Sequence, residues 1–201
     1  MATLYLRPNA NGGVIQLTPY GATYNWDCVD DVTPDDNATY VCAALVAWQK
    51  DLYQLQDTSI SGTINWINVW VRCSGASEWG TPQGSTTLRT YDTDYNGSAF
   101  NISSTWTNFY TQYSTNPYTG SAWTWAEINA LQAGVQLYSP NEKAMALCTQ
   151  VYIEVNYTPR VYYWSGSSWV APTAIKYWTG SAWQNVSGVY YWNGSSWVKV
   201  W

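Results

Sequence analysis

The sequence predicts an all-β protein. It would contain a jelly-roll-like β-sandwich with one short helix, followed by a small C-terminal appendage of β-hairpin repeats. Charged residues make up only 10% of the 201 residues and aromatic residues 17%, and aromatic and β-branched side chains favour strands. Roughly eight short segments of alternating apolar and polar residues are separated by turn residues, which is typical of a sandwich. A unit rich in Trp and Tyr occurs three times near the C-terminus, which indicates structural repeats.

The predicted strands of the sandwich lie within residues 1–158. The two clearest are residues 64–73 and 146–157. In these strands apolar residues alternate with polar or aromatic ones, so one side of each should face a core and the other side solvent. Residues 41–55 fit both helical spacing and two strands around a loop, and we favour strands. The shorter predicted strands are residues 3–6, 14–17, 87–91, 99–102, 106–112 and 135–138.

One helix is predicted from its first turn. Thr124 and Glu127 are three residues apart in T-W-A-E, the spacing of a capping box in which each side chain accepts a hydrogen bond from the other residue's backbone N–H. Trp125 and Leu131 would line one face of this helix. Gly134 stands where a helix commonly ends. We therefore expect a helix of about ten residues that covers one end of the sandwich.

From residue 159 onward the sequence contains three copies of Y-W-x-G-S-x-W, spaced by 14 residues. The x-G-S-x centre predicts a tight turn and the flanks predict strands, so each copy should be a β-hairpin. A lone hairpin is marginal in water, so the repeats should bury their faces on one another or on another chain. We therefore divide the chain into a sandwich at 1–158 and an appendage at 159–201. The tryptophans expected to contact a partner subunit or to stack on sugar rings are Trp164, Trp169, Trp178, Trp183, Trp192 and Trp197.

Composition also excludes several classes of function. The chain has no histidine, which removes Ser-His, Cys-His and metal-His mechanisms. Its net charge is −5 with only eight Lys and Arg residues, which form no cluster, so neither nucleic acid nor a membrane surface is an expected partner. No apolar run approaches the ~18 residues of a membrane span, and the N-terminal M-A-T-L-Y-L-R-P-N is not expected to direct secretion. Most carboxylates lie in turns, so we expect a protein that is not an enzyme.

Two acidic segments could hold calcium, which prefers clustered carboxylate oxygens. The first is the loop D-C-V-D-D-V-T-P-D-D, whose candidate ligands are Asp30, Asp31, Asp35 and Asp36. Its alternative interpretation is a solvated surface loop, which we favour. The second is D-T-D-Y-N-G, with Asp92, Asp94 and Asn96, but its twelfth position is Ser103 where an EF-hand needs Glu. Apart from calcium at these segments, no cofactor is expected.

Four cysteines permit two disulfides. Cys73 and Cys148 each lie near one end of a predicted strand, so neighbouring strands could bring them together as a disulfide. The alternative interpretation is that all four are small buried apolar residues.

Several segments resemble a known family. T-L-Y-L-R-P-N, D-D-V-T-P-D-D-N-A-T-Y-V, S-G-T-I-N-W-I-N-V-W-V-R, C-T-Q-V-Y-I-E-V-N-Y and, most specifically, W-A-E-I-N-A-L-Q-A-G-V resemble a jelly-roll-like domain of tailed-phage virion structural proteins. The terminal Y-W-x-G-S-x-W units are similar to short Trp-Gly-Ser-Trp repeats at the ends of such virion proteins. The resemblance implies a non-enzymatic tail, fibre or head-decoration subunit. This subunit would be located in the virion and would assemble with copies of itself and other virion proteins.

Two other functions fit the same sequence. One is a carbohydrate-binding or receptor-binding module that contacts host surface glycans through the repeats, each copy adding avidity. The other is a subunit of an extracellular filament. The carbohydrate-binding hypothesis predicts that some Trp side chains of the repeats are exposed to solvent on one face.

Overall fold

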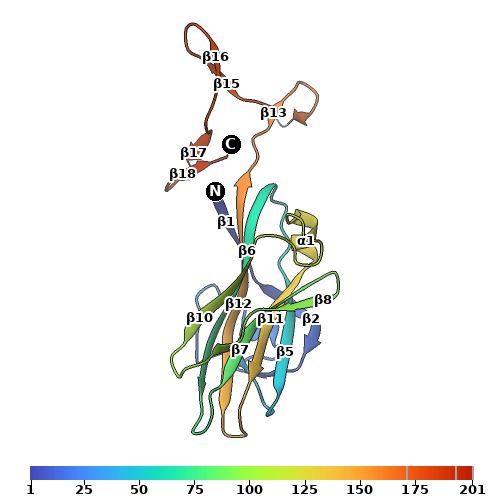
Figure 1. Ribbon diagram of the computed structural model, residues 1–201, viewed down its shortest axis with the longest axis vertical. Coiled ribbons are helices and arrows are strands. Elements are labelled where there is room, and N and C mark those ends of the chain that lie inside the picture. Colours follow the sequence, from blue (N-terminus) through green and yellow to red (C-terminus); the bar gives the residue numbers. More distant parts are fainter. Residues whose placement is uncertain (171, 193, 201) are drawn as a thin grey trace.

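The computed structural model describes residues 1–170, 172–192 and 194–200. It confirms an all-β architecture with one short α-helix. Two six-stranded sheets pack face to face as a sandwich, and three small two-stranded sheets follow at the end of the chain (Figure 1). Every strand pair is antiparallel. No helix in the described ranges has the length and apolar character needed to cross a membrane.

The first sheet is built around two long strands, β6 and β12, which pair along nearly their whole length. In this register Trp70 lies opposite Tyr152 and Val71 lies opposite Val151. The sheet order is β10 (Thr107–Tyr113), β6 (Gly62–Ala76), β12 (Met145–Pro159), β4 (Tyr40–Cys42) and β3 (Thr18–Tyr20), with β1 (Ala2–Leu6) also paired to β12.

The second sheet has β11 at its centre, paired with β5 on one side and with β7 on the other. Gly134 of β11 is buried there, and a side chain at this position would collide with the Asp51 carbonyl oxygen of β5. The sheet order is β2 (Pro8–Ile15), β5 (Trp48–Leu55), β11 (Gln132–Tyr138), β7 (Gln83–Thr90) and β8 (Thr93–Asn96), with β9 (Phe100–Asn101) also paired to β7.

The core lies between the two sheets and follows the predicted alternation. Val151, Ile153 and Val155 are fully buried, whereas the intervening Tyr152 and Glu154 lie on the outer face of the sheet and are partly exposed. Each fully buried aliphatic side chain stabilises the fold by roughly 1.5–3 kcal/mol relative to exposure. Residues 41–55 form β4 and β5, as favoured from the sequence.

The buried side chain of Asp51 links β5 to neighbouring segments of the chain. Asp51 of β5 is 0% exposed and accepts hydrogen bonds from the backbone N–H groups of Gln16 and Leu17 at 2.7 and 2.9 Å. Its other oxygen accepts from Asn25 Nδ2 at 2.7 Å and from the Tyr53 hydroxyl at 2.9 Å. Four donors surrounding one carboxylate hold the segment between β2 and β3, together with the 3₁₀ turn η1 (Trp26–Cys28) that follows Asn25, against β5.

The helix α1 (Trp125–Ala130) begins with the predicted capping box: Glu127 N–H donates to Thr124 Oγ1 at 3.2 Å and Thr124 N–H to Glu127 Oε2 at 2.8 Å. The helix has six residues rather than the ten expected. Leu131 already has the extended backbone of a strand (ψ 161°). Gly134 therefore serves close contact between β11 and β5, and does not end the helix.

The appendage consists of three separate hairpins beyond the end of β12 (Figure 1). The boundary between residues 158 and 159 stays a prediction, and β12 itself ends at Pro159. The hairpin strands are β13 (Tyr163–Trp164) with β14 (Trp169–Val170), β15 (Lys176–Trp178) with β16 (Trp183–Asn185), and β17 (Tyr190–Trp192) with β18 (Trp197–Lys199).

Candidate functional site

The repeats share one turn geometry. In the first, Ser165 N–H donates to the Ser168 carbonyl at 2.9 Å, and Ser165 Oγ accepts from Ser168 N–H at 3.2 Å. In the second, Thr179 and Ala182 make the matching bonds at 3.0 and 3.1 Å. The turn glycine is left-handed each time, with φ of 98°, 98° and 101° at Gly166, Gly180 and Gly194, a conformation that Gly adopts without steric cost. The x-G-S-x prediction of a tight turn is therefore confirmed.

Each turn places two tryptophans directly opposite each other across the hairpin. Their ring centroids are 5.5–5.7 Å apart and their planes meet at 55–62°. The first and third pairs are edge-to-face, an arrangement favoured by the charge distribution of aromatic rings, and the second is tilted. Such cross-strand pairs stabilise a hairpin by roughly 0.5–1.5 kcal/mol beyond burial. The pairs are Trp164 with Trp169, Trp178 with Trp183, and Trp192 with Trp197.

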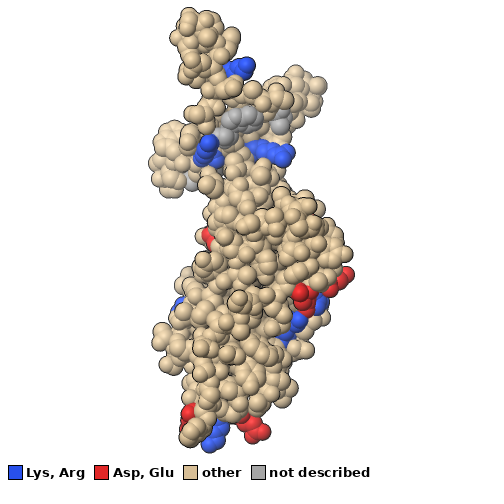
Figure 2. Space-filling view, in the orientation of Figure 1, with Lys and Arg blue, Asp and Glu red and all other residues tan. Residues whose placement is uncertain are grey.

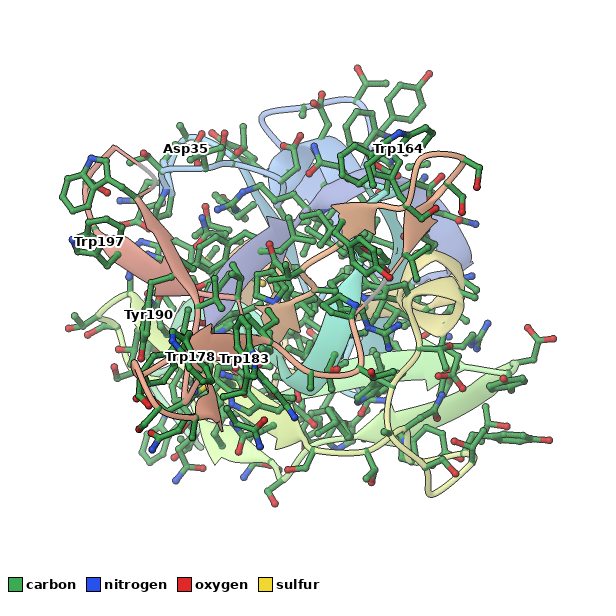
Figure 3. The ribbon with its side chains drawn as sticks, turned by 90° about the horizontal axis from the view of Figure 1, so that it is seen from above. Asp35, Trp164, Trp178, Trp183, Tyr190 and Trp197 are labelled. Atoms are coloured by element: carbon green, nitrogen blue, oxygen red, sulfur yellow. The ribbon has the colours of Figure 1, made fainter. Side chains whose placement is uncertain are left out.

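All six of these side chains are exposed. The first tryptophan of each pair is 53–55% exposed and the second 66–68%. Seen from above, Trp164, Trp178 and Trp197 lie on different sides of the appendage, while Trp178 and Trp183 lie together (Figure 3). The hairpins therefore do not bury their Trp pairs against one another within the chain. They present three similar aromatic surfaces in different directions.

Residues 159–201 contain no Asp or Glu side chain. The charged residues of the appendage are Arg160, Lys176 and Lys199, and Figure 2 shows blue but no red among the hairpins.

The acidic loop is tied to the first sheet by specific bonds. Asp36 accepts from Arg72 Nε and Nη2 at 2.6 and 2.8 Å, and this ion pair raises the pKa of Arg72. Asp35 accepts from Thr39 and Thr149. Burial raises the pKa values of the remaining two candidates, Asp30 and Asp31.

The second acidic segment forms the β7–β8 turn and strand β8. Asp94 lies between Lys50 and Arg89, with Arg89 Nε at 2.6 Å from Asp94 Oδ1, and Asn96 accepts from the Thr87 hydroxyl at 2.5 Å. In the described part of the chain, no three Cys, Asp or Glu side chains gather as a metal site. Calcium binding at either segment stays a prediction.

The proposed cysteine pair lies on neighbouring strands, as the sequence suggested. Cys73 and Cys148 are register partners across β6 and β12, but the structure contains them as free thiols instead of a disulfide. Both are 0% exposed, and the Cys148 thiol donates to the Gln150 carbonyl at 3.4 Å. Burial raises the pKa of Cys73 well above its usual value, which favours the unreactive thiol over the thiolate that oxidation requires.

The sequence did not reveal an aromatic row on the outer face of the first sheet. Tyr5, Tyr152, Trp70 and Tyr110 follow one another across β1, β12, β6 and β10, with centroids 5.8, 6.0 and 4.5 Å apart. Glu154 fixes the row by accepting from Trp70 Nε1 at 2.8 Å. Tyr152 and Trp70 could be recognised as outward residues of their strands. Their partners could not, because strand order is not a local property of the sequence.

Comparison with known proteins gives little further guidance. No family model and no curated protein matches the chain. Among solved structures, it is similar to the CBM22-1 xylan-binding domain from Paenibacillus barcinonensis Xyn10C, at 11% identity and a TM-score of 0.40, over 74% of this chain and 85% of that one. It is also similar to TmCBM61 in complex with β-1,4-galactotriose, at 8% identity and a TM-score of 0.37, over 74% and 86%. These likenesses are too low to say anything about function.

Proposed function

We propose that this protein is a non-enzymatic carbohydrate-binding protein whose three hairpins contact sugar rings through their Trp pairs. The observation that carries the proposal is the repeated presentation of paired indoles that are more than half exposed. Pyranose rings have faces of C–H groups that pack against aromatic faces, and burial of both surfaces removes apolar area from water.

In this proposal the three repeats act together through multivalent binding. One exposed Trp pair offers little area, so a single contact is weak. Three pairs on one chain make later contacts intramolecular, which raises overall avidity by about 100-fold or more when one ligand spans them. Hairpins that point in different directions suit a branched or surface-attached glycan better than a short soluble one.

The same exposed pairs also fit a second function, a virion structural subunit that assembles through the appendage. Trp and Tyr dominate the energetics of protein interfaces, and the hairpins leave them unburied within the chain. In this case the Trp pairs would be buried between subunits, and the protein would form stable oligomers. Light scattering combined with size-exclusion chromatography separates the two functions, because glycan binding does not require the free protein to oligomerise.

The direct test is binding to immobilised glycans by the full chain and by Trp169→Ala, Trp183→Ala and Trp197→Ala, singly and combined. Each single change should weaken binding about tenfold and the triple change about 100-fold or more. Trp79→Ala is the matched control, because Trp79 is 78% exposed but lies in the sandwich; it should bind like the unchanged protein. Equal binding by the triple variant would exclude the hairpins as the glycan site.

A further inference from the structure

A hollow with both polar and apolar lining lies beside α1, where the β7–β8 turn and the start of β11 meet the helix. Its volume is about 360 Å³ and its lining includes Arg89, Tyr91, Asp92, Glu127 and Gln132. Pockets for small molecules start at roughly 300 Å³, so this one has room for one or two sugar rings. The helix lies at the end of the sandwich from which the appendage extends (Figure 1), and the hollow is lined from β7, the β7–β8 turn, the α1 region and the start of β11.

Tyr91, at the edge of the hollow, has an unusual backbone conformation. Tyr91 and Asp92 form the two-residue turn between β7 and β8, and both are left-handed, with φ of 50° and 56°. Asn and Gly normally occupy such turns, because bulky side chains are disfavoured there. The Tyr91 ring stacks on Tyr118 with centroids 4.7 Å apart and planes at 16°, and its hydroxyl donates to Glu127 Oε1 at 3.2 Å. These contacts hold an aromatic side chain that is still 55% exposed at the hollow.

The polar side chains that line the hollow are held in place by hydrogen bonds within the protein itself. Arg89 is oriented by two bonds to Asp94 at 2.6 and 3.1 Å. Glu127 is fixed by the capping box, and Gln132 Oε1 accepts from Gly13 N–H at 2.8 Å. Gly13 has no side chain to obstruct this wall, whereas a Cβ there would collide with Arg89 Nη1. Preorganised groups lose little freedom on binding, which favours affinity.

The chemistry of the wall selects the ligand class. Asp94 pairs with both Arg89 and Lys50, and the nearby carboxylates of Asp92 and Glu127 disfavour an anionic ligand. Carboxylate oxygens accept hydrogen bonds from the hydroxyl groups of a sugar, whereas an amide and a guanidinium donate hydrogen bonds to those hydroxyl groups. Tyr91 offers an apolar surface. We propose that this hollow binds a terminal ring of a neutral sugar. The site shares its ligand class with the proposed function but none of its residues, so it stands even if the hairpins bind no glycan.

The test is an NMR titration of the ¹⁵N-labelled full chain with methyl glycosides of glucose, galactose, mannose and xylose. For at least one of them, the amide signals of Tyr91, Asp92 and Gln132 should shift, with a dissociation constant on the order of 1 mM for so small a ligand. Tyr91→Asn should weaken binding about tenfold. Asn tolerates the left-handed backbone, so this variant should melt no lower than the unchanged protein. Asp92→Asn should weaken binding less, because it keeps one acceptor oxygen.

Two controls keep this site apart from the hairpins. Tyr24→Asn removes a tyrosine that is also 55% exposed and stacked on an aromatic neighbour, and it should bind normally. The combined Trp169→Ala, Trp183→Ala and Trp197→Ala variant should also keep the Tyr91 shifts. The proposal is overturned if no glycoside shifts these signals at about 50 mM, far above the expected constant. It is equally overturned if the Tyr91→Asn variant binds unchanged, or if the shifts depend on the hairpin tryptophans.

Discussion

The sandwich and the appendage use the same aromatic residue types in different ways. On the outer face of the first sheet, Trp70 lies between Tyr152 and Tyr110, with ring planes at 14° and 33°, and it is partly buried. In the appendage, Trp169 is 68% exposed and meets one other ring. A wide sheet supplies neighbours on both sides of a residue and a two-stranded hairpin supplies only one. The width of the sheet, more than the residue type, thus determines which aromatic side chains remain free for a partner.

The largest effect should come from the interior of the sandwich. Asp51→Ala removes the shared acceptor of four hydrogen-bond donors in a buried place, so unfolding free energy should fall by about 3–5 kcal/mol. Urea denaturation monitored by circular dichroism measures this change in unfolding free energy. A loss below about 1 kcal/mol would mean that water replaces the carboxylate.

A smaller effect should separate the aromatic row from the hairpins. Trp70→Ala removes two ring contacts and the bond to Glu154, so it should destabilise the sandwich by about 2 kcal/mol. Trp169→Ala should leave the main unfolding transition unchanged, because its cross-strand ring partner, Trp164, belongs to the same hairpin. Equal losses in the two variants would show that the hairpins pack on the sandwich.

An ion pair of the second sheet should give a weaker, pH-dependent effect. Hydrogen bonds from Arg89, and then from Lys50, lower the pKa of Asp94 below its ordinary value of 3.8. This stabilisation is therefore complete above pH 3.8 and is lost as the pH falls through the lower folded value. Asp94→Asn should cost up to about 1 kcal/mol at pH 7 and less in acid, as measured by urea denaturation at several pH values. A cost independent of pH would assign it to the lost hydrogen bonds alone.

The smallest effect should follow removal of the appendage. A chain that ends at Pro159 keeps all of β12, so its thermal midpoint should lie within about 2 °C of the full chain, because no buried residue of the sandwich is lost. Differential scanning calorimetry provides the comparison. A broad or absent transition would show that the sandwich needs the repeats in order to fold.

Local signals in the sequence predicted much of this fold. Alternation marked β6 and β12, the T-W-A-E spacing marked the start of α1, and x-G-S-x marked three turns. Each depends on residues only a few positions apart. Gly134 shows the limit of such rules, because its role comes from the approach of β5, which lies far away in the sequence.

The sites were harder to predict than the fold. The six repeat tryptophans could be named from their spacing, but not whether partners within the chain would cover them. The hollow beside α1 joins Gly13, Arg89, Tyr91 and Glu127, which come from three segments far apart in the sequence. The left-handed Tyr91 also breaks the usual turn preference, so local sequence rules point away from it.

The distribution of charge has a consequence for how the molecule meets other surfaces. Every Asp and Glu residue precedes position 155, while the charged side chains of the appendage are all basic. The molecule is therefore an electric dipole with its positive end at the hairpins. Near a negatively charged surface, the net charge of −5 repels the molecule as a whole, while a torque turns the basic appendage toward the surface, with a strength that decreases as ionic strength rises. The molecule would then be oriented before it touches the surface, and the tryptophans of the appendage would make the first contact.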